Sequence, residues 1–267
     1  MKILAEKTAK DAAEKKAKAA KDKAAAAAAT LAENGGKTSG SGSAGHAAKP
    51  EKPAFSHAAF DALLRKYVST SGKVNYQGLK KEEAKLNEYL LMLSGTPIGK
   101  DWSRSKKMAY WINAYNAHTI KLILKNYPVA SITKLHGGKP WDVKWIKLNG
   151  KTLSLNNIEN DILRPQYKDA RIHFAVNCAA QSCPPLLNRA WTAKNLNANL
   201  DKQAKAFINN PKFNKISPNS AEVSKIFDWY GKDFGNLIDF LNKYSTTKIN
   251  SGATISYKEY DWKLNGK

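Results

Sequence analysis

From Phe55 onward the sequence begins with three segments in which apolar and polar residues alternate as in amphipathic helices. Apolar residues from Phe55 to Val68 recur at helical spacing, and a second helix is predicted from about Gln77 to Leu93, before Gly95 and Pro97. A third run from Ser105 to about Tyr127 carries apolar side chains over an arc of roughly 220°. We therefore expect the third helix to be buried on most of its circumference.

Two amides and one histidine stand out on this third helix. Asn113 and Asn116 fall inside the apolar arc, and a buried amide without partners costs about 1–3 kcal/mol. We expect specific hydrogen bonds to hold both, either to tie down loops or to orient a catalytic group or substrate. His118 shares the narrow polar face with three lysines, so we expect it at the surface.

The pattern then changes to short strands separated by helices. Residues 143–148 and 151–155 flank Asn149-Gly150, a dipeptide that favours the type I′ turn of a hairpin. We expect further strands at 213–217 and 253–257, and helices over 158–163, behind Thr192, near 223–230 and over 235–244. Helices outnumber strands, which favours a helix-rich α+β domain with a small, mostly antiparallel sheet.

Residues 1–52 differ from the rest in composition. They repeat Ala, Lys and Glu and then become Gly- and Ser-rich, with almost no large apolar residue, so we expect disorder or a solitary helix followed by a linker. The globular domain is predicted over 53–267. No convincing secretory signal begins the chain and no apolar run reaches transmembrane length, which favours a soluble or peripheral protein whose compartment stays open.

The chain is strongly basic, with a formal charge of +22. The tail holds 11 Lys against 6 acidic residues, and the remainder holds 33 basic against 16 acidic residues, a net +17. Such a charge favours weak, salt-sensitive contacts with anionic partners. The basic residues look dispersed, so we do not expect nucleic acid as a specific ligand.

The densest chemistry lies in residues 171–185, which contain both cysteines. We predict a short strand over Ile172–Val176 that delivers Cys178 to a turn or a helix start, where a thiolate is stabilised. His173 is the nearest candidate base, and a turn at Asn177 would bring the thiol back toward the imidazole. Asn113, Asn116 and Asp261 are candidates to orient the imidazole or to stabilise an oxyanion, as in Cys-His-Asn sites.

Five motifs, in order along residues 55–265, resemble the family called domain of unknown function 547. The motifs are Trp111-Ile-Asn-Ala-Tyr-Asn116, Ser154-Leu-Asn-Asn-Ile-Glu159 with Ile162-Leu-Arg164, Arg171-Ile-His-Phe-Ala-Val-Asn-Cys178, Ser182-Cys-Pro184 and Tyr260-Asp-Trp262. The resemblance implies no assigned activity, and related bacterial proteins often look exported. A papain- or transglutaminase-like architecture is one candidate fold.

Three functions remain open. The first is a thiol-dependent hydrolase or acyl transferase that uses Cys178 on an amide, peptide or thioester. The second is a non-catalytic basic module that binds anionic partners, and the third is a redox thiol protein that uses Cys178 and Cys183. No cofactor is expected, and His173, Cys178 and Cys183 lack a fourth zinc ligand at suitable spacing. Asp228 and Asp233 are further candidates to supply a carboxylate to a cleft, although a position on a helix surface explains them equally well, and His136 lies in a loop that could reach a site.

Overall fold

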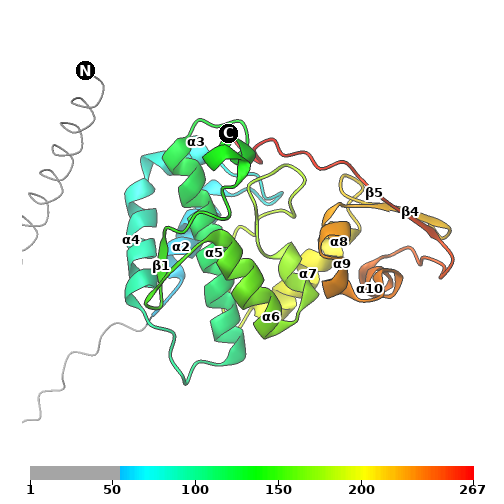
Figure 1. The fold of residues 1–267 in the computed structure, drawn as a ribbon, viewed down its shortest axis with the longest axis horizontal. Coiled ribbons are helices and arrows are strands. Elements are labelled where there is room, and N and C mark those ends of the chain that lie inside the picture. Colours follow the sequence, from blue (N-terminus) through cyan, green and yellow to red (C-terminus); the bar gives the residue numbers. More distant parts are fainter. Residues whose placement is uncertain (1–54) are drawn as a thin grey trace, which may run out of the picture. The chain divides into compact units, whose positions relative to one another are not determined.

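The computed structural model describes residues 55–267, and the predicted tail and linker over 1–52 lie outside the described residues. Residues from Ala54 to Lys267 form one compact unit. Helices dominate it, as expected for a helix-rich α+β domain (Figure 1). The α-helices are α2 (Ala58–Tyr67), α3 (Tyr76–Lys81), α4 (Glu83–Gly95), α5 (Arg104–Asn126), α6 (Arg164–Tyr167), α7 (Leu196–Ile208), α8 (Ile226–Trp229), α9 (Gly231–Phe234) and α10 (Leu237–Tyr244).

Four short helical segments connect several of these helices. Three are 3₁₀ turns, and the fourth is a wider π-helical segment that leads directly into α6. The four segments are η1 (Ile132–Lys134), η2 (His136–Gly138), η3 (the π-helix, Asn157–Leu163) and η4 (Ala170–Phe174). The helix predicted over 158–163 is therefore present in π-helical form. No described helix is both long enough and apolar enough to cross a membrane.

Helix α5 forms the centre of the domain. Ser103 accepts a hydrogen bond from the Lys106 amide at the helix start, and the helix ends at Tyr127, which precedes a proline and so is disfavoured in the α conformation. Nearly every side chain from Met108 to Leu124 is buried, which confirms the predicted burial. The predicted second helix is broken in two at Glu82, whose carboxylate bonds Lys66 of α2.

The strands form two small sheets. Strands β1 (Ile146–Leu148) and β2 (Lys151–Leu153) pair antiparallel as the predicted hairpin, with positive φ at Asn149 and Gly150 as a type I′ turn requires. Strands β3 (Lys215–Ile216), β4 (Ser220–Val223) and β5 (Thr254–Tyr257) form the second sheet, in which β3 and β4 are antiparallel and β4 and β5 are parallel. The sequence pattern missed β4, which is only four residues long.

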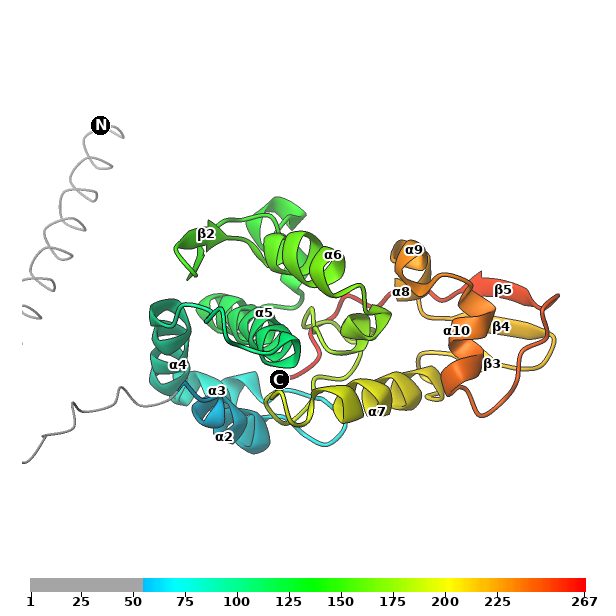
Figure 2. The same cartoon turned by 90° about the horizontal axis from the view of Figure 1, so that it is seen from below.

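Two hydrophobic cores divide the domain. Helices α2 to α5 build the first core, and phenylalanines of α7 to α10 build much of the second. Helix α7 joins them, since Leu196 and Leu200 belong to the first core whereas Phe207 and Ile208 belong to the second. Figure 2 shows α7 running from the N-terminal helices toward α10 and β3.

Residues 170–176 also join the two cores, but not as the predicted strand. They form η4 because the Asp169 carboxylate caps the turn at the Arg171 amide, which allows Phe174 to enter the second core while Ile172 enters the first. A pleated strand would place Ile172 and Phe174 on the same face of a sheet, and neither sheet of the described residues includes this segment. The strand prediction over Ile172–Val176 was wrong.

Candidate functional site

A polar loop after η4 carries the two cysteines. The Asn177 side chain shapes it by donating to the Pro184 carbonyl oxygen at 2.9 Å and accepting from the Ala179 amide at 2.9 Å. Ala179 adopts a positive φ of 61°, and the Cys183 amide donates to the Ala180 carbonyl oxygen. These bonds fold residues 177–184 back on themselves, so Cys178 and Cys183 lie next to each other.

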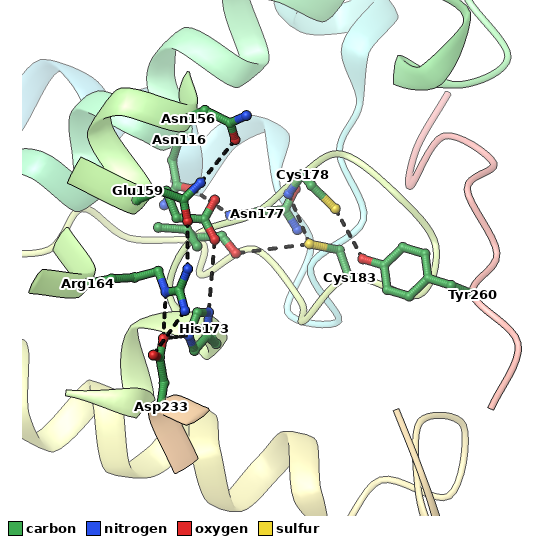
Figure 3. Close-up of polar contacts among 12 residues, drawn as sticks. Asn116, Asn156, Glu159, Arg164, His173, Asn177, Cys178, Cys183, Asp233 and Tyr260 are labelled. Carbon is green, nitrogen blue, oxygen red and sulfur yellow. Dashed lines mark hydrogen bonds and ion pairs between the residues drawn. The ribbon is translucent and has the colours of Figure 1, made fainter. Parts of the chain in front are cut away.

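The two thiols differ in exposure and in hydrogen bonding. Both are free, but Cys178 is partly exposed whereas Cys183 is buried. The Cys178 amide donates to Cys183 Sγ at 2.9 Å, and Cys178 Sγ lies 3.1 Å from the Tyr260 hydroxyl oxygen (Figure 3). Hydrogen bonds from the Cys183 thiol and then from Tyr260 lower the pKa of Cys178, whereas burial raises the pKa of Cys183 well above its ordinary value.

The C-terminal segment places Tyr260 over this thiol. Residues 261–265 run beside the cysteine loop, where the Gln181 amide donates to the Lys263 carbonyl oxygen and the Asn265 amide donates to the Ala179 carbonyl oxygen. Gly266 then passes so close to Val74 that a Cβ atom would lie 1.8 Å from the Val74 carbonyl oxygen. A glycine at this position lets the C-terminal segment seat against the loop.

His173 lies in a separate network, beside the ion pair of Arg164 and Asp233. Its Nε2 is 2.8 Å from Asp233 Oδ2, and Arg164 binds the same carboxylate with Nε and Nη2 at 2.6 and 3.0 Å (Figure 3). The imidazole stacks on Tyr230 with ring centroids 4.0 Å apart, and only 1% of the His173 side chain is exposed. The hydrogen bond from His173, and then that from Arg164, hold the pKa of Asp233 well below its usual range.

Glu159 approaches the other ring nitrogen. Its Oε1 is 3.9 Å from His173 Nδ1, which is longer than a hydrogen bond, and Nδ1 has no hydrogen-bond partner among residues 55–267. Glu159 comes from the π-helix η3, and its side chain is 6% exposed. Burial, and then the nearby Glu159 carboxylate, raise the pKa of Tyr230 well above its ordinary value.

A cavity of about 260 Å³, which we call the thiol pocket, lies between these two groups. Cys178 and Cys183 line it on one side, and His173 and Glu159 line it on the other. Val176, which follows the end of η4, lines the pocket together with His173. Aromatic side chains make up most of the remaining wall, namely Tyr115, Trp141, Trp229, Tyr230, Tyr260 and Trp262.

The imidazole and the thiol share this pocket without touching. The Tyr260 hydroxyl and the Cys183 thiol contact Cys178 Sγ, while His173 bonds Asp233. Figure 3 shows Cys178 pointing toward Tyr260, with His173 beside Asp233 and Arg164. The predicted strand and turn, which were to place the imidazole against the thiol, are replaced by η4 and the cysteine loop.

Both candidate asparagines of α5 bind backbone groups. Asn116 donates to the Ala175 carbonyl oxygen and accepts from the Asn177 amide, both at 2.9 Å. Asn113 makes the same pair of bonds to the carbonyl oxygen and amide of Trp191, at 2.7 and 3.0 Å. The bonds of Asn116 span the joint between His173 and Cys178, so this side chain positions both.

Asp261 and two histidines lie apart from the thiol pocket. The exposed Asp261 accepts from the Lys263 amide, and its own amide donates to Ser182 Oγ. His136 is exposed in η2. The expectation that His118 is a surface residue was wrong, because Trp145 covers its ring at a centroid distance of 5.3 Å and only 5% of the residue is exposed. Burial lowers the pKa of His118 to about 4.

Sequence reasoning missed most partners of the two reactive groups. The sequence analysis placed Tyr260 and Arg164 only within motifs of the family that the chain resembles. It proposed Asp233 only as one of two carboxylates that could face a cleft, and it gave Glu159 no role. Tyr260 lies 82 residues from Cys178 in the sequence, and Asp233 lies 60 residues from His173. No local sequence pattern therefore indicates these contacts. Within the described part of the chain, no cluster of three His, Cys, Asp or Glu residues is arranged to hold a metal ion.

A family model without an assigned activity matches part of the chain. No curated protein and no solved structure matches the chain, so the papain- or transglutaminase-like architecture stays a prediction. The matched region extends from before α5 to the end of α7 and therefore includes Glu159, His173 and both cysteines. Residues 99–208 match the family model described as "Protein of unknown function, DUF547".

Proposed function

We propose that this domain is a thiol-dependent hydrolase or acyl transferase in which Cys178 attacks an amide, peptide or thioester. The observation that carries the proposal is the position of Cys178 Sγ, which is partly exposed at the thiol pocket and 3.1 Å from the Tyr260 hydroxyl. A lowered pKa increases the fraction of thiolate, the nucleophilic form, at neutral pH. A non-catalytic packing role would favour a sulfur sealed among aliphatic groups.

The reaction would begin with a thiolate and an imidazolium on opposite sides of the bound substrate. Cys178 Sγ forms a bond to the carbonyl carbon, the bond to the leaving nitrogen or sulfur breaks, and His173 gives that atom a proton. Water, or an acceptor amine, then attacks the thioester while neutral His173 takes its proton. This second step releases the acyl product and restores both the thiolate and the imidazolium.

Neighbouring residues would support these steps in different ways. Asp233, held by Arg164, orients the imidazole and stabilises its charged form. The Tyr260 hydroxyl is a positioned donor for the thiolate. Because His173 and Cys178 do not touch, the substrate must lie between them for the proton to be transferred to its leaving group.

Acyl trapping tests this function. We expect p-nitrophenyl acetate to acetylate the folded protein at Cys178, as located by peptide mass spectrometry, and the adduct to disappear on further incubation. Cys178→Ala should abolish the modification, whereas Cys183→Ala, the matched control for the second thiol, should retain it. No adduct on Cys178, or equal acetylation of the Cys178→Ala protein, would contradict the proposal.

A second candidate is a redox pair formed by Cys178 and Cys183. The observation that favours it is the contact between the cysteines, with Cys183 Sγ 2.9 Å from the Cys178 amide nitrogen. Glutathione disulfide would be the oxidant: the two thiols lose two protons and form an Sγ–Sγ bond, and the electron pair reduces the oxidant to two glutathione thiols. Non-reducing mass spectrometry in glutathione buffers measures this, and two free thiols under fully oxidising buffer would exclude it.

A further inference from the structure

The carboxyl group of Glu159 is buried at the wall of the thiol pocket. Its side chain is only 6% exposed, yet it lines the cavity. Among the described residues, the Tyr230 hydroxyl is a hydrogen-bond partner of this carboxylate, and His173 Nδ1 stands 3.9 Å away. Arg164, the cation of the neighbouring network, is engaged by Asp233 through two bonds.

A carboxylate in this position calls for a donor from outside the chain. An ionised carboxylate has about four acceptor sites, and the Tyr230 hydroxyl can fill only one of them, so leaving the others empty in a buried place is unfavourable. A primary ammonium group offers three donors and a compensating charge. Its size suits a cavity of about 260 Å³ that must also admit an acyl group beside Cys178.

The remaining walls favour the same kind of group. Trp141, Trp229, Tyr230 and Trp262 all line the thiol pocket, and Trp229 and Trp262 stack with ring centroids 5.7 Å apart. The electron-rich faces of such rings attract alkylammonium groups, and aromatic cages are a common way to bind them. Trp229 is 46% exposed, so this part of the wall is open to an entering ligand.

We propose that the thiol pocket binds a substrate that carries a primary alkylammonium group, held by Glu159 among these aromatic rings. The proposal rests on the proposed function for the reaction itself, since the acyl carbon of the same substrate would face Cys178. Near the cavity the charges of Asp233 and Arg164 offset each other, as do those of the Cys178 thiolate and the His173 imidazolium in the proposed reaction, which leaves Glu159 to set the local sign. The net positive charge of the whole chain acts over longer distances and is screened by salt.

Ligand binding without acyl chemistry tests this inference. The full-length protein is titrated at fixed ionic strength with n-butylammonium chloride and with the neutral probe 1-butanol, and binding is followed by calorimetry. We expect n-butylammonium to bind at least about tenfold more tightly than 1-butanol, and Glu159→Gln to remove that preference. Equal affinity for the two probes, or an unchanged preference in Glu159→Gln, overturns the proposal.

A second variant and a second ammonium probe sharpen the result. Trp229→Ala alters a half-exposed residue, so it should fold even if Glu159→Gln does not, and we expect it to weaken n-butylammonium binding about threefold or more. Unchanged binding in Trp229→Ala would count against the aromatic part of the proposal. Tighter binding of alaninamide assigns an ammonium adjacent to the acyl carbon, whereas tighter binding of n-butylammonium assigns a lysine-like side chain.

This experiment is independent of the acyl-trapping result. Selective ammonium binding together with no adduct on Cys178 would reject the thiol chemistry and keep the cation site. An acetyl adduct on Cys178 together with no ammonium preference would keep the chemistry and reject the cation site.

Discussion

The two sides of the thiol pocket are built on different physical principles. On the imidazole side, His173 is almost fully buried and is held by the Asp233 carboxylate, which Arg164 binds in turn. On the thiol side, Cys178 is partly exposed and is contacted by neutral groups, the Tyr260 hydroxyl and the Cys183 thiol. Ion pairs thus fix one side in place, whereas the other can change its charge without breaking an ion pair.

This difference separates positioning from reactivity. A buried charge that loses its partner destabilises the fold, so changes on the imidazole side should appear as losses of stability. A neutral donor to a half-exposed thiol contributes little to folding but shifts the thiol pKa. Substitutions on the two sides should therefore be distinguished by what they change.

The largest expected effect on stability comes from Asn116, which holds the backbone between His173 and Cys178. Asn116→Ala leaves the buried Ala175 carbonyl and Asn177 amide without their partner, and we expect a loss of about 3 kcal/mol in the free energy of unfolding. Urea denaturation measures it. Asn126→Ala on the same helix is the control, because the exposed Asn126 bonds only its own helix at Leu122, and it should cost under about 1 kcal/mol. Similar losses in the two variants would argue against this role for Asn116.

The second-largest loss of stability is expected on the imidazole side of the pocket. Asp233→Asn removes the charge that Arg164 and His173 share, and we expect a loss of about 1–2 kcal/mol in unfolding free energy at pH 7. The folded pKa of Asp233 lies below its ordinary value of 3.8, so its contribution is present above about pH 4 and is lost as the pH falls below that value.

Denaturation curves at several pH values check this. The difference in unfolding free energy between the wild-type protein and Asp233→Asn should be constant near neutral pH and should become smaller below about pH 4. The control Asp239→Asn, at an exposed residue, should differ little from the wild-type protein in unfolding free energy. A difference in unfolding free energy that grows as the pH falls would mean that ionised Asp233 does not stabilise the fold.

The thiol side should show the smallest change in stability and a clear change in rate. Tyr260→Phe removes the hydroxyl that lowers the pKa of Cys178, so we expect iodoacetamide to label this thiol roughly threefold to tenfold more slowly at pH 7. Tyr257→Phe, at an exposed tyrosine of β5, is the matched control. Faster labelling in Tyr260→Phe would mean that Tyr260 shields the thiol rather than activating it.

Local patterns predicted the parts of the fold that local forces determine. The apolar arc of α5 and the Asn149-Gly150 turn depend on helical spacing and on positive φ, and both were correct. The pattern failed where a remote side chain decides the outcome. His118 lies on the polar face of α5, but Trp145 from the chain before β1 covers it, which no helical wheel can indicate.

The same distinction applies to the site. Sequence analysis identified the segment that carries His173 and Cys178, because both lie within six residues of one another in a chemically dense stretch. It missed the groups that set their properties, since Asp233 and Tyr260 come from later elements that fold back onto that segment. The β-prone residues 172–176 were misread because the Asp169 cap and the two cores outweigh their strand propensity.

The most direct test of the thiol as a nucleophile is the pH dependence of Cys178 alkylation in the folded protein. Iodoacetamide labelling is followed by peptide mass spectrometry from pH 5 to 10, with Cys183 as the internal comparison. The account predicts that the Cys178 rate reaches half its maximum below pH 9.0, the ordinary thiol value, while Cys183 stays unlabelled. A Cys178 rate that rises only above pH 9.0, or that matches the slow rate of Cys183, would contradict it.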